Sequence, residues 1–227
     1  MSTLVGIVGH SGTGKSTSIE GLDPKETVIV NVSNKPLPFK GWKNKYIQGK
    51  LSEGANYVST DTSATIVTAM KFISDNRPEI KHIILDDIQY LMSFEFMAKA
   101  KERGFDKFTD IAKNTFDVLN TGRQLRDDLI VFALYHEEST NENFNQKRKI
   151  KTIGKLLDDK ITLEGLFTIV LFTEVRIEED QRPHYYFVTQ TDGVTTAKSP
   201  RGMFDELSIP NDLSLVSTKI NAIEVAP

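Results

Sequence analysis

The sequence contains no cysteine among its 227 residues. Disulfide bonds, cysteine-ligated zinc and thiol nucleophiles are therefore excluded. No apolar run approaches the roughly 20 residues of a membrane-spanning helix. No basic segment precedes an apolar stretch near the N-terminus, as it does in a secretion signal. We therefore expect a cytoplasmic protein with no membrane partner.

The sequence also lacks a strong charge of either sign. Its 28 Lys and Arg residues nearly balance 31 Asp and Glu residues, for a net charge of -3. Any attraction to nucleic acid must then come from a local patch rather than from the whole surface. A hydrophobic content of 39% is ordinary for a globular chain and argues against disorder. The length suits one large α/β domain, expected at residues 1–207, followed at 208–227 by a tail or arm.

A nucleotide-binding motif lies near the start of the chain. The apolar residues 4–8 fit a buried strand, and the letters GHSGTGKS follow from Gly9 to Ser16. They match the P-loop pattern G-x-x-x-x-G-K-[ST] in its expected setting, after a strand. Glycines let the backbone turn tightly and approach an anion closely. Lys15 would reach the β- and γ-phosphates, and the Ser16 hydroxyl would serve Mg²⁺.

Hydrophobic patterns predict alternating strands and helices along the rest of the chain. Further strands are expected at residues 27–32, 82–87, 129–136 and 166–175, and helices at 15–22, 61–76 and in two pieces within 88–128, with a short amphipathic helix or turn at 152–164. Asp192-Gly193 favours a β-hairpin between residues 184–189 and 194–197. Such alternation is typical of an α/β fold, with a mostly parallel central sheet covered on both faces. Residues 34–54 form an unusually long connection, which allows a functional loop.

Two strand ends carry further candidate residues. The apolar run before Asp86 and Asp87 matches a Walker B pattern, in which Asp86 would hold Mg²⁺ beside the P-loop. The alternative is a strand that ends in solvated acids. His136 ends the next strand, where it could face the γ-phosphate or be merely structural. Residues 137–151 then read as a hairpin or mobile loop that becomes basic towards its end.

The order of these features resembles the RecA-like ATPase core. More narrowly, the chain is similar to small phage RecA-like ATPases, some of which are single-strand annealing recombinases. The similarity is carried by GHSGTGKS, IILDDI, LIVFALYHEE, TIGKLLDDKITLEGLFTIVLFTEV and YYFVTQTDGVTTAKSPRG. It implies a three-layer P-loop NTPase core with a C-terminal β-hairpin. It also implies a phage protein in the host cytoplasm, active in DNA recombination.

The resemblance also implies roles for individual residues. ATP would be bound by the P-loop residues Gly9, His10, Ser11, Gly12, Thr13, Gly14, Lys15, Ser16 and Thr17, with Mg²⁺ on Ser16 and Asp86. His136 would sense the γ-phosphate, and Lys198 or Arg201 would reach into a neighbour's ATP site. Single-stranded DNA would contact the loop residues Phe144, Lys147, Arg148, Lys149 and Lys151. The alternative for these residues is a solvated turn. The partners implied are DNA, further copies in a ring or filament, and a single-strand-binding protein.

One feature departs from the RecA-like pattern. Such ATPases usually carry a catalytic glutamate at or just after the second strand, but Asn31-Val32-Ser33-Asn34 holds no carboxylate. Either Asp87 orients the attacking water, as the acid after Walker B does in AAA+ ATPases, or hydrolysis is slow. A nucleotide-binding switch with little hydrolysis therefore remains open.

Other classes of P-loop protein fit less of the sequence. Asp86-Asp87 favours an AAA+-like or helicase-loader ATPase, but the chain has little room for a helical lid domain. A P-loop kinase would need a lid of arginines, and residues 147–151 hold only Arg148. A GTPase would need an acid to recognise guanine, which the segment Asn34-Lys35-Pro36-Leu37 lacks.

Overall fold

We analysed a computed structural model of the chain, which describes residues 1–104, 106–142, 145–153 and 162–224. Its helices and strands alternate along the first two thirds of the chain, as the hydrophobic pattern predicts. None of the helices in these ranges has the length and apolar character needed to cross a bilayer.

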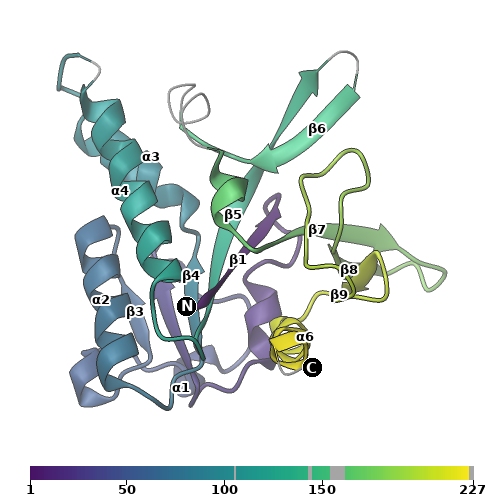
Figure 1. The fold of residues 1–227 in the computed structure, drawn as a ribbon, viewed down its shortest axis with the longest axis horizontal. Coiled ribbons are helices and arrows are strands. Elements are labelled where there is room, and N and C mark those ends of the chain that lie inside the picture. The colour runs from purple at the N-terminus through teal and green to yellow at the C-terminus, as the bar shows by residue number, and fades with distance from the viewer. Residues whose placement is uncertain (105, 143–144, 154–161, 225–227) are drawn as a thin grey trace.

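A single sheet of nine strands forms the centre of the described structure (Figure 1). Its strands are β1 (Thr3–Gly9), β2 (Thr27–Asn31), β3 (Tyr57–Ser59), β4 (His82–Asp86), β5 (Ile130–Glu142), β6 (Asn145–Ile150), β7 (Ile169–Ile177), β8 (Pro183–Val188) and β9 (Ser208–Pro210). Their order is β3-β2-β4-β5-β1-β7-β8-β9, and β6 pairs with the outer part of β5. The first six strands of this order are parallel, which confirms the predicted fold class.

Helices cover both faces of the sheet, so the fold has three layers (Figure 1). Alternate strand residues point to opposite faces: Leu4 and Val8 join one apolar cluster, whereas Val5 and Ile7 join the other. The first cluster is completed by α2 (Ser63–Asn76), α3 (Gln89–Ala98) and α4 (Asp106–Arg123). The second is completed by the short helix η1 (Thr17–Gly21) and by α6 (Leu213–Glu224).

The connections differ in detail from the sequence prediction. The helix expected at residues 15–22 is only the 3₁₀ turn η1, and the long segment 34–54 contains the short helices α1 (Trp42–Lys45) and η2 (Leu51–Glu53). Of the helix or turn expected at residues 152–164, residues 154–161 lie outside the described structure. The following turn η3 (Leu163–Leu166) leads into β7.

The predicted hairpin around Asp192-Gly193 is wrong in its pairing. β8 does form, but it pairs with β7 on one side and β9 on the other, rather than with residues 194–197. The Asp192 carboxylate instead caps its own loop, because its Oδ1 accepts hydrogen bonds from the backbone N–H groups of Val194 and Thr195. The C-terminal hairpin is therefore the β7–β8 pair.

The residues expected to form a tail or arm, 208–227, pack against the sheet as far as the structure describes them. β9 extends the sheet, and Leu213, Val216 and Ile220 of α6 are buried in the second apolar cluster. His82 on β4 fixes this helix, because its Nε2 lies 2.7 Å from Ser217 Oγ. The last three residues, 225–227, lie outside the described ranges.

Candidate functional site

The P-loop turn begins at Gly9, the last residue of β1. Its glycines are required for two reasons, backbone conformation and lack of space for a side chain. Gly12 and Gly14 adopt φ values of 80° and 92°, in the left-handed region that side chains avoid. Gly9 has no room for a side chain, because a Cβ there would lie 1.7 Å from Thr173 Oγ1. The backbone of the loop is therefore shaped by positions where only glycine fits.

Lys15 bends back over this turn. Its Nζ donates hydrogen bonds to the carbonyl oxygens of Gly9, at 2.8 Å, and His10, at 2.7 Å. The residue is only 6% exposed, and this burial lowers the pKa of Lys15 to about 8. A phosphate in the loop would offer the ammonium group a charged acceptor in place of two neutral carbonyls.

Ser16 and Asp86 meet at the carboxyl ends of β1 and β4. The Ser16 hydroxyl donates a 2.7 Å hydrogen bond to Asp86 Oδ1, although β5 lies between the two strands in the sheet. Asn31, at the end of β2, points its Nδ2 at the other Asp86 oxygen from 3.4 Å. Burial, followed by the nearby negative charge of Asp87, raises the pKa of Asp86 to about 6. The structure thus brings the predicted pair of metal ligands into contact.

These two side chains suit a magnesium ion that is shared with phosphates. Mg²⁺ prefers oxygen ligands, and it is usually held by one or two protein groups together with phosphate oxygens and water. Within the described ranges, no group of three or more His, Asp or Glu residues could hold a metal ion. Ser16 and Asp86 would therefore supply the protein's share of the ligands, and the nucleotide would supply others.

Asp87 follows in a left-handed conformation, with φ of 56°. Its Oδ2 accepts hydrogen bonds from Ser33 Oγ at 2.7 Å and from Lys35 Nζ at 2.9 Å. Partial burial would raise the pKa of Asp87, but the nearby His136 ring, Lys35 and Ser33 outweigh it and hold the pKa well below its usual range. Asp87 is therefore an ionised carboxylate in neutral solution.

His136 lies in the middle of β5, opposite Gly9, where the pairing of β5 with β1 ends. Its Nε2 is buried 3.5 Å from Asp87 Oδ1, without a hydrogen-bond partner in the described structure. The edge of its ring faces Tyr90, with 5.6 Å between ring centroids. His136 thus lies beside Asp87 and lines the same cavity as both acids.

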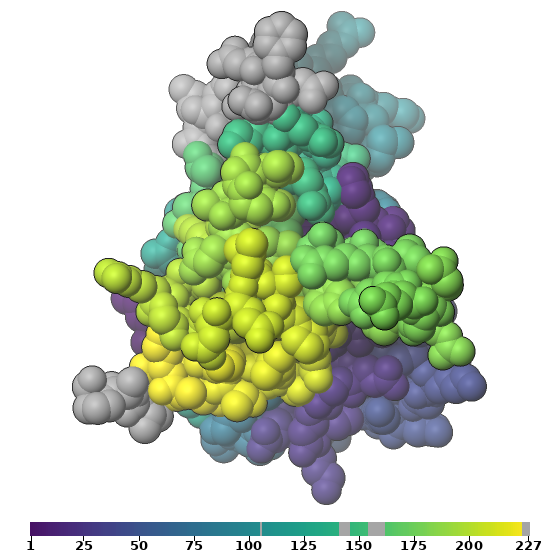
Figure 2. Space-filling view, turned by 90° about the vertical axis from the view of Figure 1, so that its right-hand side faces the viewer, coloured from purple at the N-terminus to yellow at the C-terminus, as the bar shows by residue number. Residues whose placement is uncertain are grey.

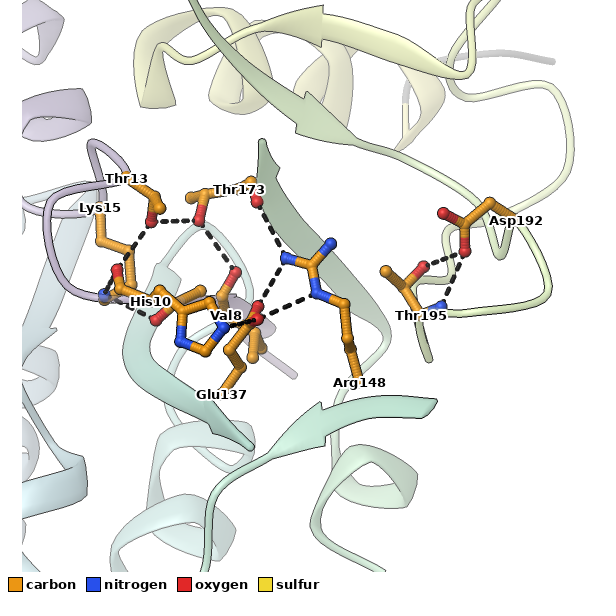
Figure 3. A network of polar contacts seen from close by, with 10 residues as sticks. Val8, His10, Thr13, Lys15, Glu137, Arg148, Thr173, Asp192 and Thr195 are labelled. Carbon is orange, nitrogen blue, oxygen red and sulfur yellow. Dashed lines mark hydrogen bonds and ion pairs between the residues drawn. The ribbon is translucent and has the colours of Figure 1, made fainter. Parts of the chain in front are cut away.

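A buried network ties the P-loop to β6 (Figure 3). The Glu137 side chain is fully buried and receives two hydrogen bonds from Arg148, Nε to Oε1 at 2.9 Å and Nη2 to Oε2 at 2.6 Å. Its Oε1 also lies 2.7 Å from His10 Nε2. On the other side, Thr13 Oγ1 meets Thr173 Oγ1 at 2.6 Å. The P-loop is therefore braced by two strands, β5 and β7.

The expected basic loop is a β5–β6 hairpin, and several of its cations are already engaged. Arg148 points inward to Glu137, so its guanidinium is not free for DNA as the sequence prediction assumed. Lys149 Nζ lies 3.1 Å from Glu138 Oε1, and Lys147 Nζ donates to the Gly193 carbonyl at 2.7 Å. Lys151 is exposed. Phe144 lies outside the described residues.

Lys198 and Arg201 lie on the segment that follows the Asp192 loop. The backbone of Lys198 exchanges two hydrogen bonds with Val170 on β7, and Arg201 is exposed in a turn. Neither residue lines the cavity that contains the P-loop. Any contact they make with a nucleotide would have to be in another copy of the chain.

A cavity of about 640 Å³ joins the P-loop to the two acids. Its lining comprises Ser11, Gly12, Gly14, Lys15, Ser16, Thr17, Lys35, Pro36, Pro38, Asp86, Asp87, His136, Pro183, His184, Tyr185, Pro210 and Asn211. Sequence reasoning identified the P-loop, both acids and His136, but not the residues from β8 and β9. For Lys35 the available signal was the unusual length of the connection that contains it.

Comparison with known families gives one match. A family model described as an AAA domain matches residues 2–201, which is most of the chain and includes the P-loop, both acids and His136. A search of curated proteins found no significant match.

Proposed function

Because the chain belongs to the AAA domain family, we propose that it binds ATP in the P-loop cavity and hydrolyses it in the presence of Mg²⁺. The observation that carries this proposal is the 2.7 Å contact between Ser16 and Asp86, directly beside the buried Lys15 ammonium. A phosphate-binding loop and a metal-binding acid are the two parts that P-loop ATPases require.

Each residue has a distinct task in this proposal. Backbone N–H groups of the P-loop and Lys15 hold the phosphates, and Ser16 and Asp86 orient them through a shared ion. When bound, Mg²⁺ neutralises charge that develops on the phosphates. Asp87, ionised and held by Ser33 and Lys35, accepts a hydrogen bond from the attacking water. His136, which lines the same cavity, would sense the γ-phosphate.

The test is phosphate release from ATP by the wild type and by Asp86→Asn. We expect Asp86→Asn to lose Mg²⁺-dependent turnover while it still binds ATP in EDTA, because Lys15 and the loop remain intact. Asp128→Asn, which changes an exposed acid outside the cavity, serves as the matched control. Retained turnover in Asp86→Asn would move the metal site elsewhere. Binding without turnover in the wild type would favour a nucleotide switch.

We further propose that the polymer partner is single-stranded DNA, bound by an oligomer that promotes annealing in phage recombination. The support is the sequence resemblance and the placement of the β5–β6 hairpin, whose Lys151 N–H donates to the His136 carbonyl at 2.9 Å. The hairpin is thus connected directly to the proposed phosphate sensor. Lys147 and Lys151 would contact the DNA phosphates. An AAA-like ATPase or helicase loader is the alternative that the family match also accommodates.

DNA binding can be tested with labelled single strands at several salt concentrations. The double variant Lys147→Ala/Lys151→Ala should bind DNA more weakly. The slope of log binding constant against log salt concentration should also become shallower, by about 1 for each DNA phosphate that the protein no longer neutralises. Lys113→Ala, on the surface of α4, should change neither quantity. If the wild type neither binds single-stranded DNA nor changes its ATP turnover in its presence, this part of the proposal fails.

A further inference from the structure

The P-loop cavity continues past the phosphate-binding turn to a second wall. This wall is built by β8 and by the residues at and after the end of β9: Pro183, His184, Tyr185, Pro210 and Asn211. The P-loop, the two acids and the remaining lining residues come from other elements. A volume of about 640 Å³ lies within the range of whole small-molecule sites. The wall therefore has room for a ligand group beyond the phosphates.

Tyr185 and Asn211 lie directly against the P-loop. A Cβ placed on Gly14 would lie 3.0 Å from Tyr185 Cδ1 and 3.1 Å from Asn211 Oδ1. The backbone N–H of Asn211 donates to the Tyr185 carbonyl at 3.1 Å, so the two residues form one unit at the corner of the sheet. In Figure 2, the green β7–β8 hairpin and the yellow C-terminal helix lie next to each other on one face.

The Asn211 side-chain amide has a donor without a hydrogen-bond partner. Its Nδ2 is buried and has no hydrogen-bond partner in the described part of the chain. Leaving a buried donor unpaired is unfavourable, and most buried polar groups in proteins have a hydrogen-bond partner. Because Asn211 lines the cavity, a bound ligand can supply the acceptor. Tyr185 is 40% exposed and adds an aromatic ring on which a flat ligand group can stack.

The strand order sets the direction in which a nucleotide would lie. Asp86 and Asp87 are on and just after β4, on one side of β1, whereas Tyr185 and Asn211 are on the other side, beyond β7. With the metal-binding end of the triphosphate at Asp86, the sugar and base would extend towards Asn211. The wall thus lies where the base of a nucleotide bound in this cavity would be located.

We propose that Tyr185 and Asn211 form the base subsite of the nucleotide and favour adenine. Tyr185 stacks on the base, Asn211 Nδ2 donates to N7, and Asn211 Oδ1 accepts from the N6 amino group, a pairing that matches adenine. Guanine presents an oxygen in place of the amino group and loses the second hydrogen bond. This inference rests on the proposed nucleotide function and adds the choice of base to it.

The test measures equilibrium binding of three probes with Mg²⁺: ATP, GTP and inorganic tripolyphosphate. Asn211→Ala should weaken ATP binding about tenfold and reduce the preference for ATP over GTP. Tyr185→Ala should weaken both nucleotides by a similar factor. Neither variant should change tripolyphosphate affinity, which also shows that each variant is folded. Tyr186→Ala, which changes the next residue on β8, is the matched control, because the Tyr186 ring contacts Arg176 and does not line the cavity.

The outcomes separate this inference from the function on which it rests. If tripolyphosphate and ATP bind but both variants keep ATP affinity within twofold, the base subsite is wrong and the proposed function stands. An equal loss of ATP and tripolyphosphate would also overturn the subsite, because it would show a general effect on the P-loop. If the wild type binds neither probe, the proposed function fails and the subsite fails with it.

Discussion

Asp86 and Asp87 are neighbours in sequence with opposite electrostatic surroundings. Burial raises the pKa of Asp86 to about 6, whereas His136, Lys35 and Ser33 hold the pKa of Asp87 well below its usual range. The left-handed backbone of Asp87 turns its side chain away from the strand pattern, towards Lys35. Two adjacent carboxylates can therefore have separate tasks, one on the metal and one on the attacking water.

Replacing Asp87 with asparagine tests this division. Asp87→Asn keeps the shape of the side chain but removes the charge that orients water, so turnover should fall about a hundredfold with little change in KM for ATP. Phosphate release at saturating ATP provides the measurement, with Asp128→Asn as the surface control. Turnover within twofold of the wild type would show that another residue activates the water.

The local motif residues could be predicted, but their remote partners could not. Lys15, Ser16 and Asp86 belong to short patterns whose spacing follows from phosphate and metal chemistry. The partners of Glu137, by contrast, come from the P-loop and from β6, and no local spacing links them. The sequence prediction therefore placed Arg148 on a DNA surface, whereas its side chain is drawn inward by a buried carboxylate.

At the scale of elements, the Glu137–Arg148 pair joins the two strands of the β5–β6 hairpin, and Arg148 Nη2 also donates a 3.2 Å hydrogen bond to the Thr173 carbonyl on β7. Arg148 also places its guanidinium 5.6 Å from the centroid of the Phe172 ring on β7. The pair is formed by a fully buried carboxylate and a cation that is 22% exposed. The hairpin is thus anchored by an interaction that cannot be weakened without leaving a buried charge.

Arg148→Ala should lower the free energy of unfolding by roughly 3–5 kcal/mol, because it leaves the Glu137 carboxylate buried without the cation that donates two hydrogen bonds to it. Lys113→Ala, which breaks the exposed pair with Asp117, should cost less than about 1 kcal/mol. Urea titrations followed by circular dichroism give both values. Equal losses in the two variants would show that the Glu137 pair carries no special weight.

His82 predicts a pH dependence of the contact between β4 and α6. Burial lowers the pKa of His82 to about 4, from an ordinary value near 6.5. Between about pH 6.5 and pH 4, His82 is protonated in the unfolded chain but neutral in the folded protein. The free energy of unfolding therefore decreases as the pH falls from about 6.5 to about 4. The full difference is about 3 kcal/mol.

The measurement compares unfolding free energies of the wild type and His82→Gln across this pH range. The glutamine can still hydrogen-bond Ser217 but cannot take up a proton, so its stability should fall less steeply with pH. The same slope in both proteins would assign the acid sensitivity to carboxylates instead.

Element types followed from hydrophobic periodicity, but strand pairing did not. The parallel strands are apolar runs that must be buried, so their existence could be predicted. The partner of β8 depends on which edge of the sheet is free after β7, and a turn signal such as Asp192-Gly193 carries no information on that. Likewise, α6 becomes a core helix only because η1 leaves that face of the sheet to be covered.

At the scale of the whole molecule, the strand order brings the candidate site together at the carboxyl-terminal side of the parallel strands. The carboxyl ends of β1 and β4 supply the P-loop and the two acids, and β5 supplies His136 at the point where its pairing with β1 ends, as expected where ligands collect in parallel sheets. Lys198 and Arg201 lie outside this cavity. Their expected role, a contact with the ATP site of a neighbouring subunit, requires a second copy of the chain.

Mixing two inactive variants tests that role. If Arg201 acts in trans, Arg201→Ala should lose at least tenfold in turnover while binding ATP normally, and adding Lys15→Ala protein should restore part of the activity. The restored activity arises at interfaces where an intact P-loop meets an intact Arg201. Lys198→Ala is tested in the same way. If Arg201→Ala and Lys198→Ala each keep full activity on their own, neither residue acts on a neighbour's ATP site.

The central claim is that the P-loop cavity binds and hydrolyses ATP, and Lys15 tests it most directly. We predict that the wild type releases phosphate from ATP in the presence of Mg²⁺. Lys15→Ala should bind ATP roughly 10- to 100-fold more weakly, because it removes a charged hydrogen-bond donor to the phosphates, and should release no phosphate above background. ATP affinity and phosphate release that are unchanged in Lys15→Ala would contradict the account.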